Sequence, residues 1–105
     1  MSDNYRNPYA LFSTDPVEHN AQWLKAKLGI TLIQLIRSKG WNQAETAAAL
    51  QVAQPRVSDL KRGKLEKFSI DMMFTMLFRL GYYFEYEHSF ESGKPSLQMK
   101  LKEKQ

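Results

Sequence analysis

Hydrophobic residues recur at helical spacing from residue 16 to residue 80 and then alternate with polar residues. The longest helical stripe lies in residues 16–39 and consists of Leu24, Leu28, Leu32, Leu35 and Ile36, widened by Trp23, Ala26, Ile30 and Ile33. Asp15 supplies an N-cap, Pro16 suits the first helical position and Gly40 ends the pattern, so we predict one long helix here. Gly29 lowers its helix propensity and indicates either a bend or a close crossing.

A second, shorter helix is predicted to begin at Gln43, with Asn42 as its cap. Small apolar side chains would allow another helix to cross it closely, and they are Ala44, Ala47, Ala48 and Leu50. A tight turn is expected at residues 51–52, because the apolar spacing is interrupted there and a new helical pattern follows.

The third predicted helix follows this turn, with Pro55 in its first turn and Gly63 after its end. Val57 and Leu60 lie three positions apart and are its expected buried residues. The other side chains are then expected to point outward, namely Gln54, Arg56, Ser58, Asp59 and Lys61.

Residues 68–80 predict a fourth helix, which Ser69 caps and Gly81 ends. Its inward stripe consists of Ile70, Met73, Leu77 and Leu80. Its other apolar side chains exceed what one small core needs, and they predict a second buried face for a subunit interface, formed by Met72, Phe74, Met76 and Phe78.

Beyond the fourth helix the pattern changes to the alternation of a β-strand. One face of residues 82–90 is apolar and consists of Tyr82, Phe84, Tyr86, His88 and Phe90. A turn is expected at residues 91–95, and a second strand would follow, with an apolar face of Leu97, Met99 and Leu101. Such a hairpin would set lysines against Glu85 and Glu87.

An isolated hairpin is only marginally stable, so we expect it to pack on a helix or on the hairpin of a second copy. The second copy is the preferred source of additional strands. Alternatively, residues 92–105 form a frayed basic tail, and only the first strand exists.

Length and composition fit one small domain. With 105 residues and 43% apolar content, the chain can bury one core, and dimerisation would add to it. We divide the chain into an N-terminal arm (1–14), a helical domain (15–81) and a C-terminal β extension (82–105), which is expected to serve dimerisation.

The net charge of +4 is weak evidence for a polyanionic partner, but its distribution is informative. Basic residues crowd the third predicted helix and its exit, and they are Arg56, Lys61, Arg62, Lys64 and Lys67. This cluster favours contacts with nucleic-acid phosphates, which would contribute affinity without sequence specificity.

Several classes of chemistry are disfavoured by the inventory of residues. The chain contains no cysteine, and His19 and His88 lack neighbours that would complete a catalytic or metal site. No glycine-rich phosphate loop occurs, so we expect no enzymatic activity, no cofactor and no metal. No stretch approaches the roughly 20 apolar residues of a membrane span, and we expect a cytoplasmic protein.

The stretch from Asn42 to Gly63 resembles the helix-turn-helix of the Cro/CI-type (XRE) family. The family pattern is Thr/Asn-Gln, then Ala, then Val-Ser/Thr, then Ile/Val-Ser, then a closing Gly. The resemblance implies a mainly helical, lambda-repressor-like bundle of about four helices, here with a C-terminal strand or hairpin. Two positions depart from the pattern. Gln51 replaces the usual turn glycine and is therefore expected to adopt a left-handed or strained backbone, and Ala53 replaces the usual Ser or Thr cap.

The resemblance also implies roles for individual residues on double-stranded DNA. The third helix would lie in the major groove and face base edges with Gln54, Pro55, Arg56 and Asp59. Expected phosphate contacts are Gln43, Ser58, Lys61, Arg62 and Lys64. A homodimer would match a palindromic operator, with a predicted interface of Met72, Phe74, Met76, Phe78, Tyr82, Phe84 and Tyr86. These roles predict a repressor that regulates its own promoter.

Two other hypotheses remain open. The chain also resembles HigA-type antitoxins, which implies that it additionally neutralises a small basic toxin, held by the N-terminal arm or the outer surface of the first helix. Alternatively, the motif serves a purely protein-binding module, in which Pro55 and Asp59 signal the loss of DNA contact.

Overall fold

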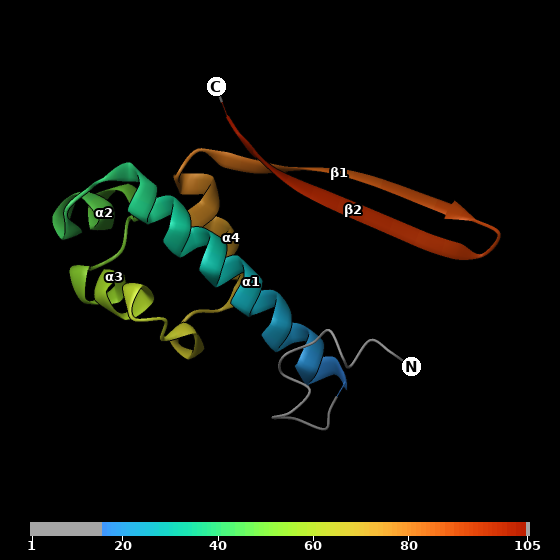
Figure 1. Cartoon of the computed structure of the whole chain (residues 1–105), viewed down its shortest axis with the longest axis horizontal. Coiled ribbons are helices and arrows are strands. Elements are labelled where there is room, and N and C mark those ends of the chain that lie inside the picture. The colour runs from blue at the N-terminus through green and yellow to red at the C-terminus, as the bar shows by residue number, and fades with distance from the viewer. Residues whose placement is uncertain (1–15, 105) are drawn as a thin grey trace.

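A computed structural model describes residues 16–104 of the chain (Figure 1). The elements are α1 (Pro16–Lys39), α2 (Gln43–Leu50), α3 (Gln54–Lys61), the short 3-10 helix η3 (Leu65–Lys67), α4 (Ile70–Arg79), β1 (Tyr82–Glu91) and β2 (Lys94–Glu103). This order confirms the mainly helical fold with a C-terminal hairpin. The predicted N-terminal arm and the Asp15 cap lie outside the described residues.

The long helix α1 runs across the helical body and packs against α3, η3 and α4 (Figure 1). Its stripe is only partly buried. Leu28, Leu32 and Ile36 enter the core, whereas Leu24 and Ile30 are 41% and 51% exposed. The stripe was therefore predicted too wide, because the core is small and only the side chains that face α3 and α4 are covered. The core is completed by Leu50, Leu60, Phe68, Met73, Met76, Leu77 and Leu80.

The glycine in α1 marks a close crossing, which confirms one of the two predicted explanations. A Cβ atom added at Gly29 would lie 2.7 Å from both Cδ atoms of Leu65 in η3. The missing side chain thus lets η3 approach the backbone of α1. This contact fixes the segment that connects α3 with α4.

Helix α2 begins as predicted but buries a different face. Asn42 Oδ1 accepts a hydrogen bond from the Glu45 backbone N–H, and Glu45 Oε1 accepts one from the Asn42 N–H, so a full capping box is present. The buried side chains of α2 are Thr46, Ala47 and Leu50, whereas Ala44 and Ala48 are exposed. The small size of the alanines did not decide burial; the orientation of this short helix did. The buried Thr46 hydroxyl is satisfied by donating to the Asn42 carbonyl.

The turn between α2 and α3 has the two unusual features that the sequence predicted. Gln51 is left-handed, with φ 59° and ψ 45°, in the position where glycine is common. Ala53 precedes α3 and makes no side-chain capping bond. Val57 and Leu60 are fully buried and anchor α3 as expected.

Helix α4 begins two residues later than predicted. Residues 65–67 form η3, and Phe68 is extended, which directs its ring into the core. Ser69 is the N-cap, and its hydroxyl accepts from the Met72 N–H at 3.0 Å. Met76 was expected at a subunit interface but has no exposed surface, because it faces the chain's own core.

The hairpin forms with both strands, so the alternative of a frayed tail at residues 92–105 is wrong for residues up to 104. Its turn consists of Ser92 and Gly93, both with positive φ, as in the tight turns that favour hairpins. Glu85 lies opposite Lys100, as predicted, but Glu87 lies opposite Gln98. The far end of the hairpin projects away from the helices (Figure 1).

Candidate nucleic-acid interface

Helices α2 and α3 form a helix-turn-helix whose second helix lies at the surface. Its buried residues hold one side of α3 in the core, while Gln54 and Pro55 at its start are exposed and Ser58 is half-buried. The side-chain amide of Gln54 is therefore accessible to a ligand that binds this face. An amide presents a donor and an acceptor side by side, which matches the edge of an adenine in the major groove.

Gln43 connects the beginnings of the two helices. Its side-chain Nε2 donates a hydrogen bond to the Gln54 carbonyl at 3.1 Å. An amide nitrogen carries two donors, so this bond leaves one donor of Gln43 for another acceptor. The predicted phosphate contact of Gln43 is thus compatible with its structural bond to α3.

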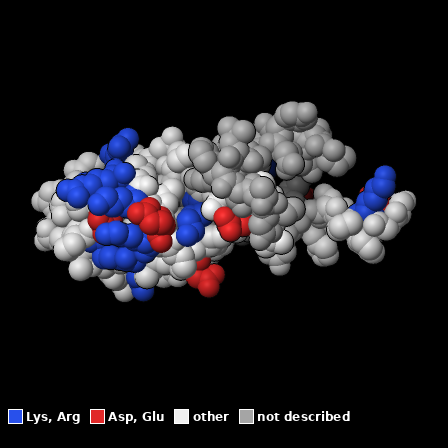
Figure 2. Space-filling model, turned by 90° about the horizontal axis from the view of Figure 1, so that it is seen from below, with Lys and Arg blue, Asp and Glu red and all other residues white. Residues whose placement is uncertain are grey.

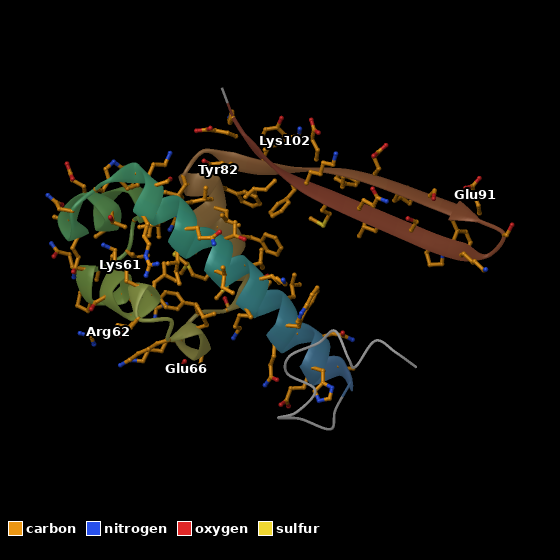
Figure 3. The ribbon with its side chains drawn as sticks, viewed as in Figure 1. Lys61, Arg62, Glu66, Tyr82, Glu91 and Lys102 are labelled. Carbon is orange, nitrogen blue, oxygen red and sulfur yellow. The ribbon has the colours of Figure 1, made fainter. Side chains whose placement is uncertain are left out.

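Basic side chains gather on the face that contains α3, at one end of the helical body (Figure 2). Lys61 and Arg62 come from the last turn of α3 and its C-cap (Figure 3). Lys64 directly precedes η3, and Lys67 is the last residue of η3. Arg62 and Lys67 are exposed, whereas Lys61 and Lys64 are half-buried. Glu66 is the exposed acidic residue of the same segment. The face is therefore predominantly positive beside the exposed start of α3.

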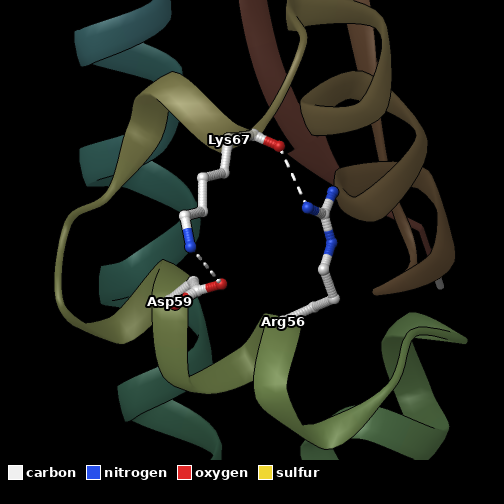
Figure 4. Close-up of polar contacts among 3 residues, drawn as sticks. All are labelled: Arg56, Asp59 and Lys67. Atoms are coloured by element: carbon white, nitrogen blue, oxygen red, sulfur yellow. Dashed lines mark hydrogen bonds and ion pairs between the residues drawn. The ribbon is translucent and has the colours of Figure 1, made fainter.

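Arg56 and Asp59, two of the predicted base contacts, are bound to the chain's own η3 segment (Figure 4). The Arg56 guanidinium donates to the Lys67 carbonyl at 3.1 Å and lies over the Phe68 ring, with Cζ 4.3 Å from the ring centroid. The Lys67 ammonium pairs with the Asp59 carboxylate at 3.4 Å. We call these contacts of Arg56 and Asp59 with Lys67 and Phe68 the α3–η3 clasp. The expectation that Arg56 points outward is wrong.

The sequence carried little signal for this clasp. Its partners lie 8 to 12 positions apart and are joined by an irregular segment, so no helical or strand spacing places them together. The only hint was the aromatic Phe68 close behind a basic run, and that pattern alone does not select Arg56 over its basic neighbours.

Neither a metal cluster nor a membrane helix occurs in the part of the chain that the structure describes. Among residues 16–104, no group of three or more His, Cys, Asp or Glu side chains could hold a metal ion. No helix in the same range is long and apolar enough to cross a membrane.

Two helices joined by a tight turn, α2 and α3, with the exposed start of α3 beside a basic patch, define a helix-turn-helix protein. Comparison with known families agrees with this class. Residues 10–85 match a family described as a helix-turn-helix domain, and because the match covers more than half of the chain, the protein belongs to this family. Its membership supports a DNA-binding regulatory role. No curated protein and no solved structure shows significant similarity to the chain.

Proposed function

We propose that the protein is a sequence-specific transcriptional regulator that binds DNA through α3, represses a promoter by occupying it, and acts in the cytoplasm on its own operator. The observation that carries this proposal is the surface of α3. Val57 and Leu60 anchor the helix, while Gln54 and Pro55 remain exposed at its start. A helix held in this way can enter the major groove with its first turn leading.

The surroundings of α3 suit the DNA backbone. Lys61, Arg62 and Lys64 lie at its other end, where they can contact phosphates. Gln43 and Ser58 can add neutral hydrogen bonds to the same backbone. Base contacts fall first to Gln54 and Pro55, because Arg56 and Asp59 are held by the clasp.

A homodimer is the second part of the proposal, and it is supported by the apolar surface that remains after folding. Phe78, Phe74 and Phe84 form a continuous aromatic row from α4 to β1, with ring centroids 6.3 Å and 5.5 Å apart. Farther along the same hairpin face, Tyr86 and Phe90 are each 69% exposed. Leu97 and Met99 on β2 add exposed fractions of 65% and 50%.

Together these side chains expose on the order of 500 Å² of largely apolar surface, taking aromatic side chains as ~200 Å² each. A stable interface takes roughly 800 Å² from each partner, so this face could form its centre. The expected interface thus includes Met72, Phe74, Phe78, Tyr82, Phe84 and Tyr86, extended by Phe90, Leu97 and Met99.

The charges of the hairpin favour packing of apolar faces over pairing of strand edges. On the polar face, β1 carries Glu85, Glu87 and Glu91, whereas β2 carries Lys94, Lys100 and Lys102. A two-fold dimer that paired β1 with β1 would align glutamates, and one that paired β2 with β2 would align lysines. Like charges on adjacent strands are destabilising, and face-to-face packing avoids both arrangements.

DNA binding is tested by fluorescence anisotropy on the upstream region of the gene and on scrambled DNA, over a series of salt concentrations. We expect tight, salt-dependent and selective binding by the wild type. Gln54→Ala should reduce selectivity, whereas Gln34→Ala removes an exposed amide from α1 and should not. Equal affinity for both DNAs, or equal effects of the two variants, would contradict the assignment of α3.

The dimer is tested by sedimentation equilibrium and by footprinting. We expect a dimer that protects two half-sites about 34 Å apart or a multiple of it. Phe90→Ser combined with Leu97→Ser should yield monomers with an unchanged circular dichroism spectrum. Glu87→Gln on the opposite face is the control and should leave the dimer intact. A monomeric wild type or a single asymmetric footprint would exclude the palindromic arrangement.

The antitoxin alternative adds a toxin-binding surface to the same regulator. The sequence assigned that surface to the N-terminal arm or to the outside of the first helix, and the arm lies outside the described residues. Our proposal is therefore DNA-binding regulation. Copurification with the product of an adjacent short, basic reading frame would extend it to toxin neutralisation.

A further inference from the structure

The α3–η3 clasp occupies the two α3 side chains that otherwise qualify best for charged contacts with bases. Arg56 is half-buried and Asp59 has an 18% exposed side chain, so both are more enclosed than Gln54 and Pro55. They lie three positions apart and therefore on one side of α3. Both hold the same residue, Lys67, one through its carbonyl and the other through its ammonium group (Figure 4).

The η3 side of the clasp is itself fixed to the core. Phe68 is 1% exposed and packs among the buried residues, and Leu65 lies directly over Gly29 of α1. The Lys67 carbonyl lies between these two anchored residues in the sequence. Arg56 thus connects α3 to a segment that is anchored in the core on both sides, while Val57 and Leu60 hold the buried side of α3.

Release of the clasp would be unfavourable for DNA binding. Arg56 would have to give up a charge-assisted hydrogen bond and its position over an aromatic ring. Asp59 would leave its partner Lys67 and bring an unpaired carboxylate toward a strongly negative groove. The exposed start of α3 needs neither change in order to meet the bases.

We propose that Arg56 and Asp59 remain bound to η3 when the protein binds DNA, and that they are positioning residues which set the orientation of α3. Sequence selectivity then resides in the exposed first turn of α3, with Gln54 as its main contact. This inference rests on the proposed DNA-binding function and goes beyond it, since it separates the residues that contact bases from those that aim the helix.

The first test measures the affinity for the operator and for every single-base variant of it. We expect Arg56→Ala to lower operator affinity about tenfold and to weaken discrimination at all positions that α3 contacts. Gln54→Ala should remove discrimination at one or two base pairs only. If Arg56→Ala instead abolishes discrimination at a single base pair and preserves it elsewhere, Arg56 contacts that base and the inference is overturned.

Nuclear magnetic resonance provides a readout that stability changes do not imitate. The Arg56 side-chain protons lie against the Phe68 ring and should be shifted by its ring current in the free protein. We expect the same shift in the DNA complex. Loss of the shift on binding the operator would show that the clasp opens and would refute the inference.

A double-mutant cycle tests the Asp59 side of the clasp. Asp59→Asn and Lys67→Met each break the ion pair. The measured quantity is selectivity, the ratio of operator to scrambled-DNA affinity, in which the non-specific effect of the altered charge cancels. The losses of selectivity should overlap, so that the double variant loses no more than either single one, and additive losses would place Asp59 or Lys67 on the bases and contradict the proposal. If the wild type shows no selective binding, the proposed DNA-binding function itself is wrong. The outcomes above contradict only the roles assigned to Arg56 and Asp59.

Discussion

Replacing Gln51 by glycine should stabilise the protein, because Gln51 is an ordinary residue in a conformation that glycine adopts without strain. The end of α2 has the bonding pattern of a Schellman motif. The Gln51 N–H donates to the Ala48 carbonyl at 3.3 Å, and the Val52 N–H donates to the Ala47 carbonyl at 3.1 Å. Gln51 itself is left-handed, with φ 59°.

The end of α3 provides a reference within the same molecule. It shows the same pair of bonds, from Gly63 to Leu60 at 2.9 Å and from Lys64 to Asp59 at 3.0 Å. The left-handed position there is Gly63, with φ 77°. A Cβ atom added at Gly63 would meet nothing within 4 Å, so a substitution there tests backbone conformation alone.

The expected magnitude follows from two opposing contributions. The left-handed conformation costs a residue with a Cβ about 1–2 kcal/mol, which Gln51→Gly removes. Glycine also gains conformational entropy in the unfolded chain, which offsets about 0.4–1 kcal/mol. We expect Gln51→Gly to raise the free energy of unfolding by about 0.5–1 kcal/mol and Gly63→Ala to lower it by a similar amount.

Urea unfolding at one fixed protein concentration measures both changes, and the melting temperature should rise by about 2–8 °C for Gln51→Gly. Gln51→Ala is the matched control, because it removes the exposed side chain and keeps the strained backbone. If Gln51→Ala stabilises the protein as much as Gln51→Gly does, the effect comes from the side chain and the conformational argument is refuted.

Three further predictions concern capping, the core and the DNA face. Asn42→Ala should lower the free energy of unfolding, measured in urea, by about 1 kcal/mol. Asn42→Ser should lower it much less, because serine can also cap the helix. Met76→Ala should lower the free energy of unfolding by about 2–5 kcal/mol at every protein concentration, because Met76 is buried in the core. A loss that depends on protein concentration would show that Met76 lies at a subunit interface. Lys61→Ala should reduce the slope of log affinity against log salt by about 1 on operator and scrambled DNA alike; an unchanged slope would exclude its phosphate contact.

The sequence predicted best what neighbouring residues determine. The cap at Asn42, the cap at Ser69 and the ends of α1 lie at the predicted positions because each depends on a few adjacent side chains. The left-handed turn at Gln51 was predicted from its place in the motif, and the paired strands were predicted from their alternation.

The predictions that failed depend on contacts between distant segments. Periodicity shows that α2 has a small apolar face, but only its orientation against α3 decides that Thr46 is buried and Ala48 exposed. In the same way, the helical spacing predicts that the Arg56 side chain points outward, but the fold brings Lys67 and Phe68 beside it. Helical spacing carries no information about such neighbours.

Most of the apolar side chains of α4 that were expected at a subunit interface are covered by the chain's own core, against which Met72 and Phe74 pack. Part of the expected interface on α4 is consumed by the monomer, because Met76 is buried there. Among the apolar side chains of α4 and the hairpin, the largest exposed fractions are those of Tyr86 and Phe90 on β1. A dimer that covers them would be held together by the hairpin as well as by the exposed side of α4. The distance between the two α3 helices, and with it the spacing of operator half-sites, would then depend on how two hairpins pack.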